Sequence, residues 1–155
     1  MNKLNQQVKY ISKILPKIAR NLRIAPLIDA VKPGLTTSQL MILLVLMDMK
    51  DAALPIGNLT DELAISSPSV TGIIDRLYKE NLVERTHSDQ DRRLVLIKLT
   101  DEGKEVANKL MKSFEELLFT VFEKLPAAEQ ESITKSIKSV FTFSDILSKS
   151  AVTEN

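Results

Sequence analysis

The chain has 155 residues, of which 44% are apolar and 26% charged, enough for one domain with a sizeable core or one domain with helical extensions. It has no cysteine and a single histidine, His87, which excludes disulfides, a thiolate nucleophile, a cysteine-rich zinc site and a cluster of histidine ligands. The net charge of +1 predicts no partner by itself, and the longest uncharged apolar run, Leu40 to Met47, is far shorter than the roughly 20 residues of a membrane-spanning helix.

The first predicted element is a helix from roughly Asn5 to Ala30. Its apolar residues recur at heptad-like spacing, in the seam Val8, Ile11, Leu15, Ile18 and Leu22. Residues 1–35 carry seven Lys/Arg against one Asp, a net charge of +6, and the basic residues gather opposite the seam. Pro16 interrupts the seam, so we expect a kink or break there. The seam fits packing within one subunit or contact between two.

A second helix is predicted to begin after Thr36, which forms with Gln39 the T-x-x-Q pattern of a capping box. The run that follows is apolar almost all round, which is typical of a buried helix. Met41 and Met47 are interpreted as core residues rather than ligands, because methionine fills irregular gaps well.

Residues 56–82 predict two short helices joined by a tight turn at Ile65–Ser67, a helix–turn–helix. Ser67 is expected to cap the second helix, with Pro68 at its first position, and the helix should run to Asn81. Its apolar residues form one compact face, made of Val70, Ile73, Ile74 and Leu77. Polar residues then occupy the rest of its surface.

An alternating strand, Leu94 to Leu99, comes next, and Val83 to Thr86 is its expected partner. The charged residues between the two strands then form the tip of a β-hairpin. A hairpin that follows a helix–turn–helix is a wing. His87 is interpreted as a wing residue rather than a metal ligand, because the chain offers no second histidine.

Two long helices are predicted towards the C-terminal end. Thr100 can cap the first, with Asp101 and Glu102 in its first turn, and the second should run from about Ala127 to Leu147. All five phenylalanines lie in these helices. Two helices cannot bury so much aromatic surface unaided, so we expect them to pack on the N-terminal helix, on a second subunit, or on both.

The residues that could carry chemistry lie in the second helix of the helix–turn–helix and in the wing. A helix fits the DNA major groove, where short hydroxyl side chains and an arginine can reach base edges or phosphates. An arginine at the wing tip can enter a minor groove, and Asp91 is placed to hold the guanidinium of Arg93. The predicted DNA-binding residues are Ser67, Pro68, Ser69, Thr71, Gly72, Arg76, Asp91, Arg92 and Arg93. The alternatives are an ordinary solvated helix face and a solvated hairpin.

Three stretches, "LTTSQLMILLVL", "LAISSPSVTGIIDRLYKENLVER" and "SDQDRRLVLIKLTDEG", together with the long helices around them, resemble the MarR family of bacterial transcription regulators. The most specific part is D-x-R at Asp91–Arg93, followed by an alternating strand and L-T-x-x-G at Leu99–Gly103. The run V-T-x-I-I-D-R-L at Val70–Leu77 supports it, whereas Ala64 stands where glycine is frequent in the turn.

The resemblance implies a mainly α fold with a small β-hairpin wing. Residues 35–104 would form a winged helix–turn–helix DNA-binding domain, and residues 1–34 and 105–155 a helical dimerisation region. The homodimer would bind a pseudo-palindromic site in double-stranded DNA, with the recognition helix in the major groove and Arg93 in the wing. Many members repress transcription and release DNA when a small aromatic or anionic compound binds between the two domains. Our candidate contacts for such an effector are Arg20, Arg23, Met41 and Leu44.

We therefore predict a cytoplasmic, sequence-specific transcriptional regulator, a repressor released by a ligand, with no cofactor, metal or catalytic site. The alternative is a winged-helix module that binds a protein and not DNA. Its best support is the balance of residues 66–104, which carry seven Lys/Arg against seven Asp/Glu. A small enzyme ranks last, because the sequence has no glycine-rich phosphate loop and no nucleophile elbow.

Overall fold

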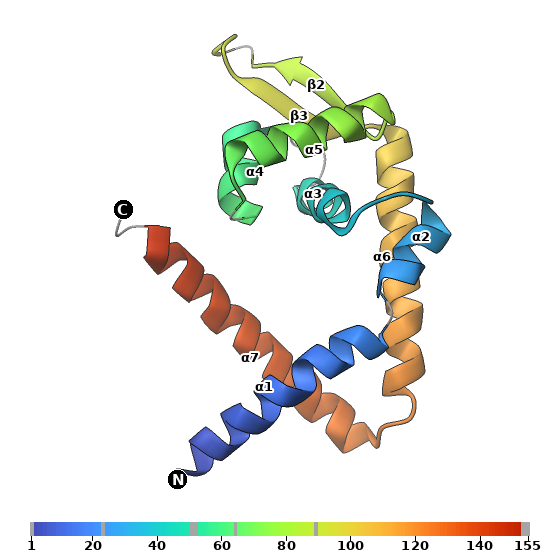
Figure 1. Ribbon diagram of the computed structural model, residues 1–155, viewed down its shortest axis with the longest axis vertical. Coiled ribbons are helices and arrows are strands. Elements are labelled where there is room, and N and C mark those ends of the chain that lie inside the picture. The colour runs from blue at the N-terminus through green and yellow to red at the C-terminus, as the bar shows by residue number, and fades with distance from the viewer. Residues whose placement is uncertain (1, 23, 50–52, 64, 89, 153–155) are drawn as a thin grey trace. The chain divides into compact units, whose positions relative to one another are not determined.

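The computed structural model describes residues 2–22, 24–49, 53–63, 65–88 and 90–152, and of residues 145–152 only the helical backbone. Within these residues the chain forms seven helices and one three-stranded sheet (Figure 1). It divides into two compact units, Met1–Phe114 and Glu115–Asn155. None of the described helices is long and apolar enough to cross a membrane.

The N-terminal segment forms two helices, α1 (Lys3–Asn21) and α2 (Ile24–Val31), instead of one. Of the kink or break expected at Pro16, the break is wrong, because α1 continues through Pro16 and ends at Asn21. Pro16 removes one N–H donor, but no residue of α1 is buried, so water can reach the carbonyl that loses its partner. The seam of α1 is exposed in the single chain, with Val8 and Ile11 both 57% exposed.

Helix α3 (Thr37–Asp48) runs through the core of the first unit. The predicted capping box is confirmed: the backbone N–H of Thr36 donates to Oε1 of Gln39 at 2.9 Å, and the N–H of Gln39 donates to the Thr36 hydroxyl at 3.3 Å. Ile42 and Leu43 are fully buried. The prediction for Met41 is wrong, since it is 48% exposed, whereas Met47 packs against the core.

The predicted helix–turn–helix is confirmed as α4 (Ile56–Leu63) and α5 (Ser67–Lys79). The cap of α5 is Ser66 and not Ser67, because Pro68 fits either of the first two helical positions and so does not fix the start. The helix also ends before the predicted Asn81, whose φ of 57° places it in the left-handed region that stops a helix.

The predicted hairpin is confirmed as β2 (Val83–His87) and β3 (Val95–Leu99), paired antiparallel from Val83 opposite Leu99 to His87 opposite Val95. The hairpin lies alongside α5 (Figure 1). A third strand, β1 (Leu54–Pro55), pairs with the other edge of β3 and gives the order β1-β3-β2. It was not predicted, because two residues are too few to show alternation.

Two long helices follow, α6 (Asp101–Phe122) and α7 (Ala127–Val152), as expected. The first half of α6 packs on the core through Ala107 and Leu110, and the boundary between the two units falls within this helix. Beyond that point large apolar side chains stay exposed in the single chain, namely Leu118, Phe119 and Val121 on α6 and Ile137, Val140, Phe141 and Phe143 on α7.

Candidate nucleic-acid interface

Helix α5 presents a largely polar surface because most of its aliphatic residues are turned inward. Val70, Ile74 and Leu77 are completely buried. The predicted residues of this helix are all exposed: Ser67, Pro68, Ser69, Thr71, Gly72 and Arg76. The structure thus collects them on the solvent side of one helix. The Thr71 hydroxyl donates a hydrogen bond to the Ser67 carbonyl at 3.0 Å. Its oxygen can still accept a hydrogen bond from a ligand.

The wing tip is shaped by hydrogen bonds within the turn. Oδ1 of Asp91 accepts from the backbone N–H of Arg93 at 2.9 Å, and the Asp91 carbonyl accepts from the N–H of Leu94 at 2.9 Å. Nδ1 of His87 lies 3.0 Å from the carbonyl of Arg92, so His87 belongs to the wing as expected. The Asp91 carboxylate therefore fixes the backbone of the turn and not, as predicted, the guanidinium of Arg93.

The cations of this domain fall into two groups. Within the described parts of the chain, Arg76, Lys79, Arg92 and Arg93 are exposed and form no ion pair. By contrast, Arg85 pairs with Asp75, and Nζ of Lys98 lies 2.6 Å from Oε1 of Glu84. The arginines without a partner are the ones that the sequence assigns to the recognition helix and the wing.

One contact between the wing and α5 was not predicted. The guanidinium of Arg85 on β2 bonds Asp75 and lies over the ring of Tyr78, 5.2 Å from its centre. The available signal was the alternation of β2, which places Arg85 on the same side as the buried Val83. Asp75 and Tyr78, one helical turn apart, then supply a carboxylate and an aromatic face.

A second unpredicted contact lies at the C-terminal end of α5. Glu80 receives a hydrogen bond from Nε2 of Gln39 at 3.3 Å, and its other oxygen lies 3.6 Å from Nζ of Lys32. Gln39 is only 2% exposed. The capping box of α3, the end of α2 and the end of the recognition helix therefore meet at one polar junction.

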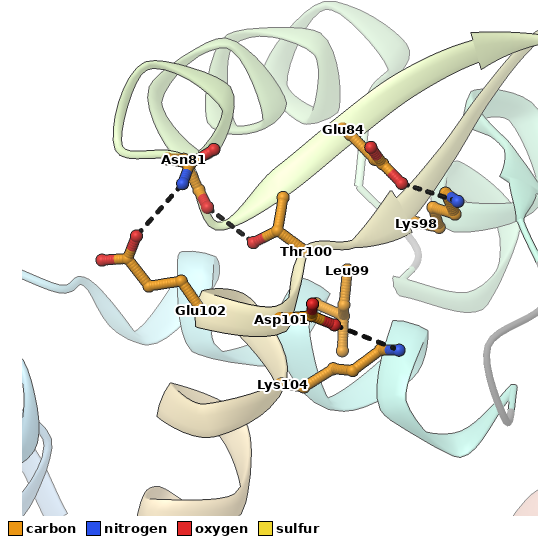
Figure 2. Close-up of a pocket in the computed structure, with 8 residues that line it drawn as sticks. All are labelled: Asn81, Glu84, Lys98, Leu99, Thr100, Asp101, Glu102 and Lys104. Carbon is orange, nitrogen blue, oxygen red and sulfur yellow. Dashed lines mark hydrogen bonds and ion pairs between the residues drawn. The ribbon is translucent and has the colours of Figure 1, made fainter.

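A pocket of about 490 Å³ lies where the wing meets α5 and α6, and Figure 2 shows its lining. The Thr100 hydroxyl donates to the Asn81 carbonyl at 2.6 Å, and the Asn81 amide donates to Glu102 at 3.2 Å (Figure 2). Nζ of Lys104 lies 3.8 Å from Oδ1 of Asp101. Because these groups satisfy one another, we interpret this pocket as a structural junction and not as a ligand site.

A separate groove of about 590 Å³ contains one of the predicted effector contacts. Its lining residues are Ala19, Arg20, Ile24, Ala25, Pro26 and Thr37. Arg20 is therefore at the groove, but Met41 and Leu44 are not among the lining residues, and Leu44 packs against the core instead. Arg23 lies outside the described residues. In the described part of the chain, no group of three His, Asp or Glu side chains could hold a metal ion.

Comparisons with known proteins match this domain. A model of the MarR family matches residues 35–95. The chain is 38% identical over 72 residues to the HTH-type transcriptional repressor MdtR of Bacillus subtilis, a match that covers 46% of this chain and 45% of MdtR. It thus spans about half the length of that relative. Over 136 residues it is 24% identical to the uncharacterized HTH-type transcriptional regulator YfiV of the same organism, covering 88% of this chain and 84% of YfiV.

Solved structures show the same fold over nearly the whole chain. A MarR family protein from Bacillus stearothermophilus gives a TM-score of 0.80 at 21% identity, covering 94% of this chain and 99% of that one. A mutant of MarR from E. coli, solved in complex with operator DNA, gives 0.65 at 21% identity, covering 90% and 99%. BpsR of Bordetella bronchiseptica, whose DNA binding is regulated by 6-hydroxynicotinic acid, gives 0.63 at 25% identity, covering 84% and 91%.

Proposed function

Since the chain is a member of the MarR family of transcriptional regulators, we propose that it binds double-stranded DNA through α5 and the wing. The observation that carries this proposal is the exposure of Arg76, Arg92 and Arg93 without ion-pair partners in the described part of the chain. Phosphates attract cations of this kind, and arginine is also the residue that best reads guanine edges and narrow grooves.

The pairing of the other cations bears on the main argument for a protein-binding module, which was the neutral charge of residues 66–104. Three carboxylates of this segment pair with cations of the same segment: Asp75 with Arg85, Glu84 with Lys98 and Asp101 with Lys104. These pairs remove three charges of each sign and leave the segment neutral, so what favours DNA is the exposed position of Arg76, Arg92 and Arg93 and not a surplus of positive charge. An overall count of charges does not describe the field that DNA would meet.

Gly72 adds independent support for close approach of DNA to α5. A β-carbon at this position would have no atom of the protein within 4 Å. Packing inside the chain therefore does not require glycine here, although glycine weakens a helix interior by about 1 kcal/mol relative to alanine. Gly57 in α4 is equally free of neighbours, so it is the position of Gly72 on the exposed side of the recognition helix that suits the close approach of a major-groove edge. Ser67, Pro68, Ser69 and Thr71 lie on the same exposed side, within reach of bases or phosphates.

We further propose a homodimer whose dimerisation region is formed by residues 1–34 and 105–155, with residues 35–104 as the DNA-binding domain. The exposed apolar side chains of α1 and α7, such as Ile11 and Phe141, support this, because patches of this kind mark interaction surfaces. A symmetric dimer would present two recognition helices to the two halves of a pseudo-palindromic site.

The finer part of the proposal is repression that a small aromatic or anionic ligand relieves. Its support is the groove at Arg20, which combines a cation with apolar lining residues. MdtR is named as a repressor, and BpsR responds to an aromatic acid. For this chain, the carboxylate of such an acid would meet Arg20, and its ring would lie against Ile24 and Pro26.

The test is a selection of bound sequences from random DNA with the purified protein, followed by affinity measurements at several salt concentrations. We expect an enriched pseudo-palindrome and an affinity that falls steeply with salt, because phosphate contacts release counterions. If no sequence is enriched and no DNA is bound in a salt-dependent way, the alternative that the chain is a protein-interaction module would be favoured instead. Random-sequence duplex of the same length is the control for non-specific binding.

A further inference from the structure

A polar contact joins the wing to α5 where the apolar core ends. Side chains on a strand alternate between its two sides, so Arg85 shares the side of Val83, which is 1% exposed. Its cross-strand neighbour, Ile97, is fully buried. Arg85 therefore continues the core-facing side of the hairpin beyond the last apolar contact, towards the tip.

At that point Arg85 meets two residues of the recognition helix. Its guanidinium donates to Oδ1 of Asp75, and the guanidinium carbon lies 5.2 Å from the centre of the Tyr78 ring. Asp75 and Tyr78 are three positions apart and thus neighbours on one face of α5. A carboxylate beside an aromatic face suits a planar, delocalised cation better than an ammonium group.

Neither global stability nor attraction to DNA accounts well for this arrangement. The side chains of Arg85 and Asp75 are 32% and 49% exposed. Because ion pairs that water can reach contribute little to stability, this pair is not explained by the stability of the fold. A carboxylate on a DNA-binding helix repels phosphates, so Asp75 on its own would oppose binding. What the contact does provide is a fixed angle between two elements that must meet the same duplex.

We propose that Arg85 is a positioning residue which, through Asp75 and Tyr78, holds the wing against α5 so that both contact one DNA site together. This inference rests on the proposed function and adds to it a cation that does not itself touch DNA. Pre-organisation of this kind raises affinity by lowering the entropy lost when the wing is ordered on binding.

The test compares the wild type, Arg85→Ala, Asp75→Asn and the double variant on the selected DNA site. Each single variant should lose about tenfold in affinity, and the double variant should lose no more, because both changes remove the same contact. The slope of affinity against salt should stay unchanged, since no phosphate contact is lost. If Arg85 bound phosphate directly, Arg85→Ala would lower the magnitude of the slope by about one for each bound wing, and Asp75→Asn would bind more tightly. This result would overturn the proposal.

Glu84→Gln is the matched control, because it breaks the Glu84–Lys98 pair on the other side of the hairpin and leaves the link to α5 intact. Its affinity should remain that of the wild type. A loss as large as that of Arg85→Ala would mean that any ion pair of the hairpin matters, contrary to the proposal. Arg85→Lys should recover only part of the affinity, because it keeps the charge and loses the planar group.

A second readout does not depend on DNA. Amide order parameters of residues 90–94 in the DNA-free protein should fall in Arg85→Ala and Asp75→Asn and stay unchanged in Glu84→Gln, with melting temperatures alike in all four proteins. If the wild type bound no DNA, the proposed function would fail and these order parameters alone would decide the positioning role. Unchanged order parameters in Arg85→Ala would refute it.

Discussion

Gly103 lies so close to the backbone of Leu82 that a β-carbon at position 103 would stand 1.9 Å from the Leu82 carbonyl oxygen. The same carbonyl accepts the N–H of Thr100 at 3.2 Å, and the Thr100 hydroxyl accepts the N–H of Gly103 at 3.0 Å. The L-T-x-x-G run therefore packs the first turn of α6 against the residue that precedes β2. Glycine is required at position 103 because its backbone contacts the backbone of Leu82.

Gly103→Ala should destabilise the protein by about 1–3 kcal/mol, because the added methyl group forces the two backbones apart. Urea unfolding followed by circular dichroism measures this. Gly57→Ala is the matched control: Gly57 lies in α4 with no atom within 4 Å of its β-carbon position, so alanine should be neutral or stabilise the protein. Equal stability of the two variants would show that the contact with Leu82 is readily relieved.

Arg76→Ala should weaken specific binding by about 1–3 kcal/mol and relax the preference at one position of each half-site, if Arg76 reads a base. Arg76→Lys separates this role from phosphate binding, because lysine keeps the charge and loses the bidentate geometry. Affinities for the selected site and for single-base variants of it decide between the two. An equal loss on all sequences would make Arg76 a phosphate anchor.

Arg93→Ala should reduce affinity strongly and lower the magnitude of the salt slope by about one for each bound wing, with dimerisation intact. Asp91→Ala should weaken binding less, and add little once Arg93 is absent. Because the Asp91 side chain accepts from the backbone N–H of Arg93, Asp91→Asn should keep the wild-type affinity. A loss in Asp91→Asn as large as in Asp91→Ala would mean that the carboxylate acts on the guanidinium instead.

Light scattering should return the mass of a dimer at micromolar concentration. Phe141→Glu should shift the mass towards the monomer, because it places a charge on a large apolar side chain that is 70% exposed in the single chain. Lys138→Glu, also exposed on α7, is the control for the added negative charge. A chain ending at Leu125 should dissociate or aggregate. A monomeric wild type would contradict the proposed assembly.

Calorimetry with a panel of aromatic acids tests the effector groove. Arg20→Ala should weaken the binding of such an acid by about 1.5–3 kcal/mol, the contribution of a hydrogen bond to a charged group. Lys17→Ala, a neighbouring exposed cation that does not line the groove, should bind as the wild type does. If the wild-type protein binds none of the acids, the proposed regulation by an aromatic acid is wrong, and the proposal of DNA binding remains.

Local patterns were enough to predict most of the fold and the position of the candidate interface. The inward face of α5 follows from the helical spacing of Val70, Ile74 and Leu77, and the capping box of α3 depends on residues three positions apart. Such features are visible in the sequence because one element contains all the groups involved.

Contacts between elements could not be predicted in this way. Gln39 and Glu80 are 41 positions apart, and they meet because α3 and α5 pack at an angle that no periodicity encodes. The L-T-x-x-G run marked Gly103, but the reason for glycine there could not be read from it, since the contacting residue Leu82 lies in the connection between α5 and β2. The groove at Arg20 could not be predicted either, because its lining residues come from α1, α2 and the start of α3. The sequence predicted one helix to about Ala30, whereas α1 ends at Asn21 and α2 begins at Ile24.

Strand β1 has a consequence for the behaviour of the chain in solution. It occupies the edge of β3 that the hairpin leaves open, and its second residue is Pro55, which has no N–H to offer. A strand this short, with a proline in it, is a poor template for the addition of a strand from another molecule. We therefore expect aggregation by sheet extension to be disfavoured on this edge, in a chain whose helices α1 and α7 expose apolar side chains.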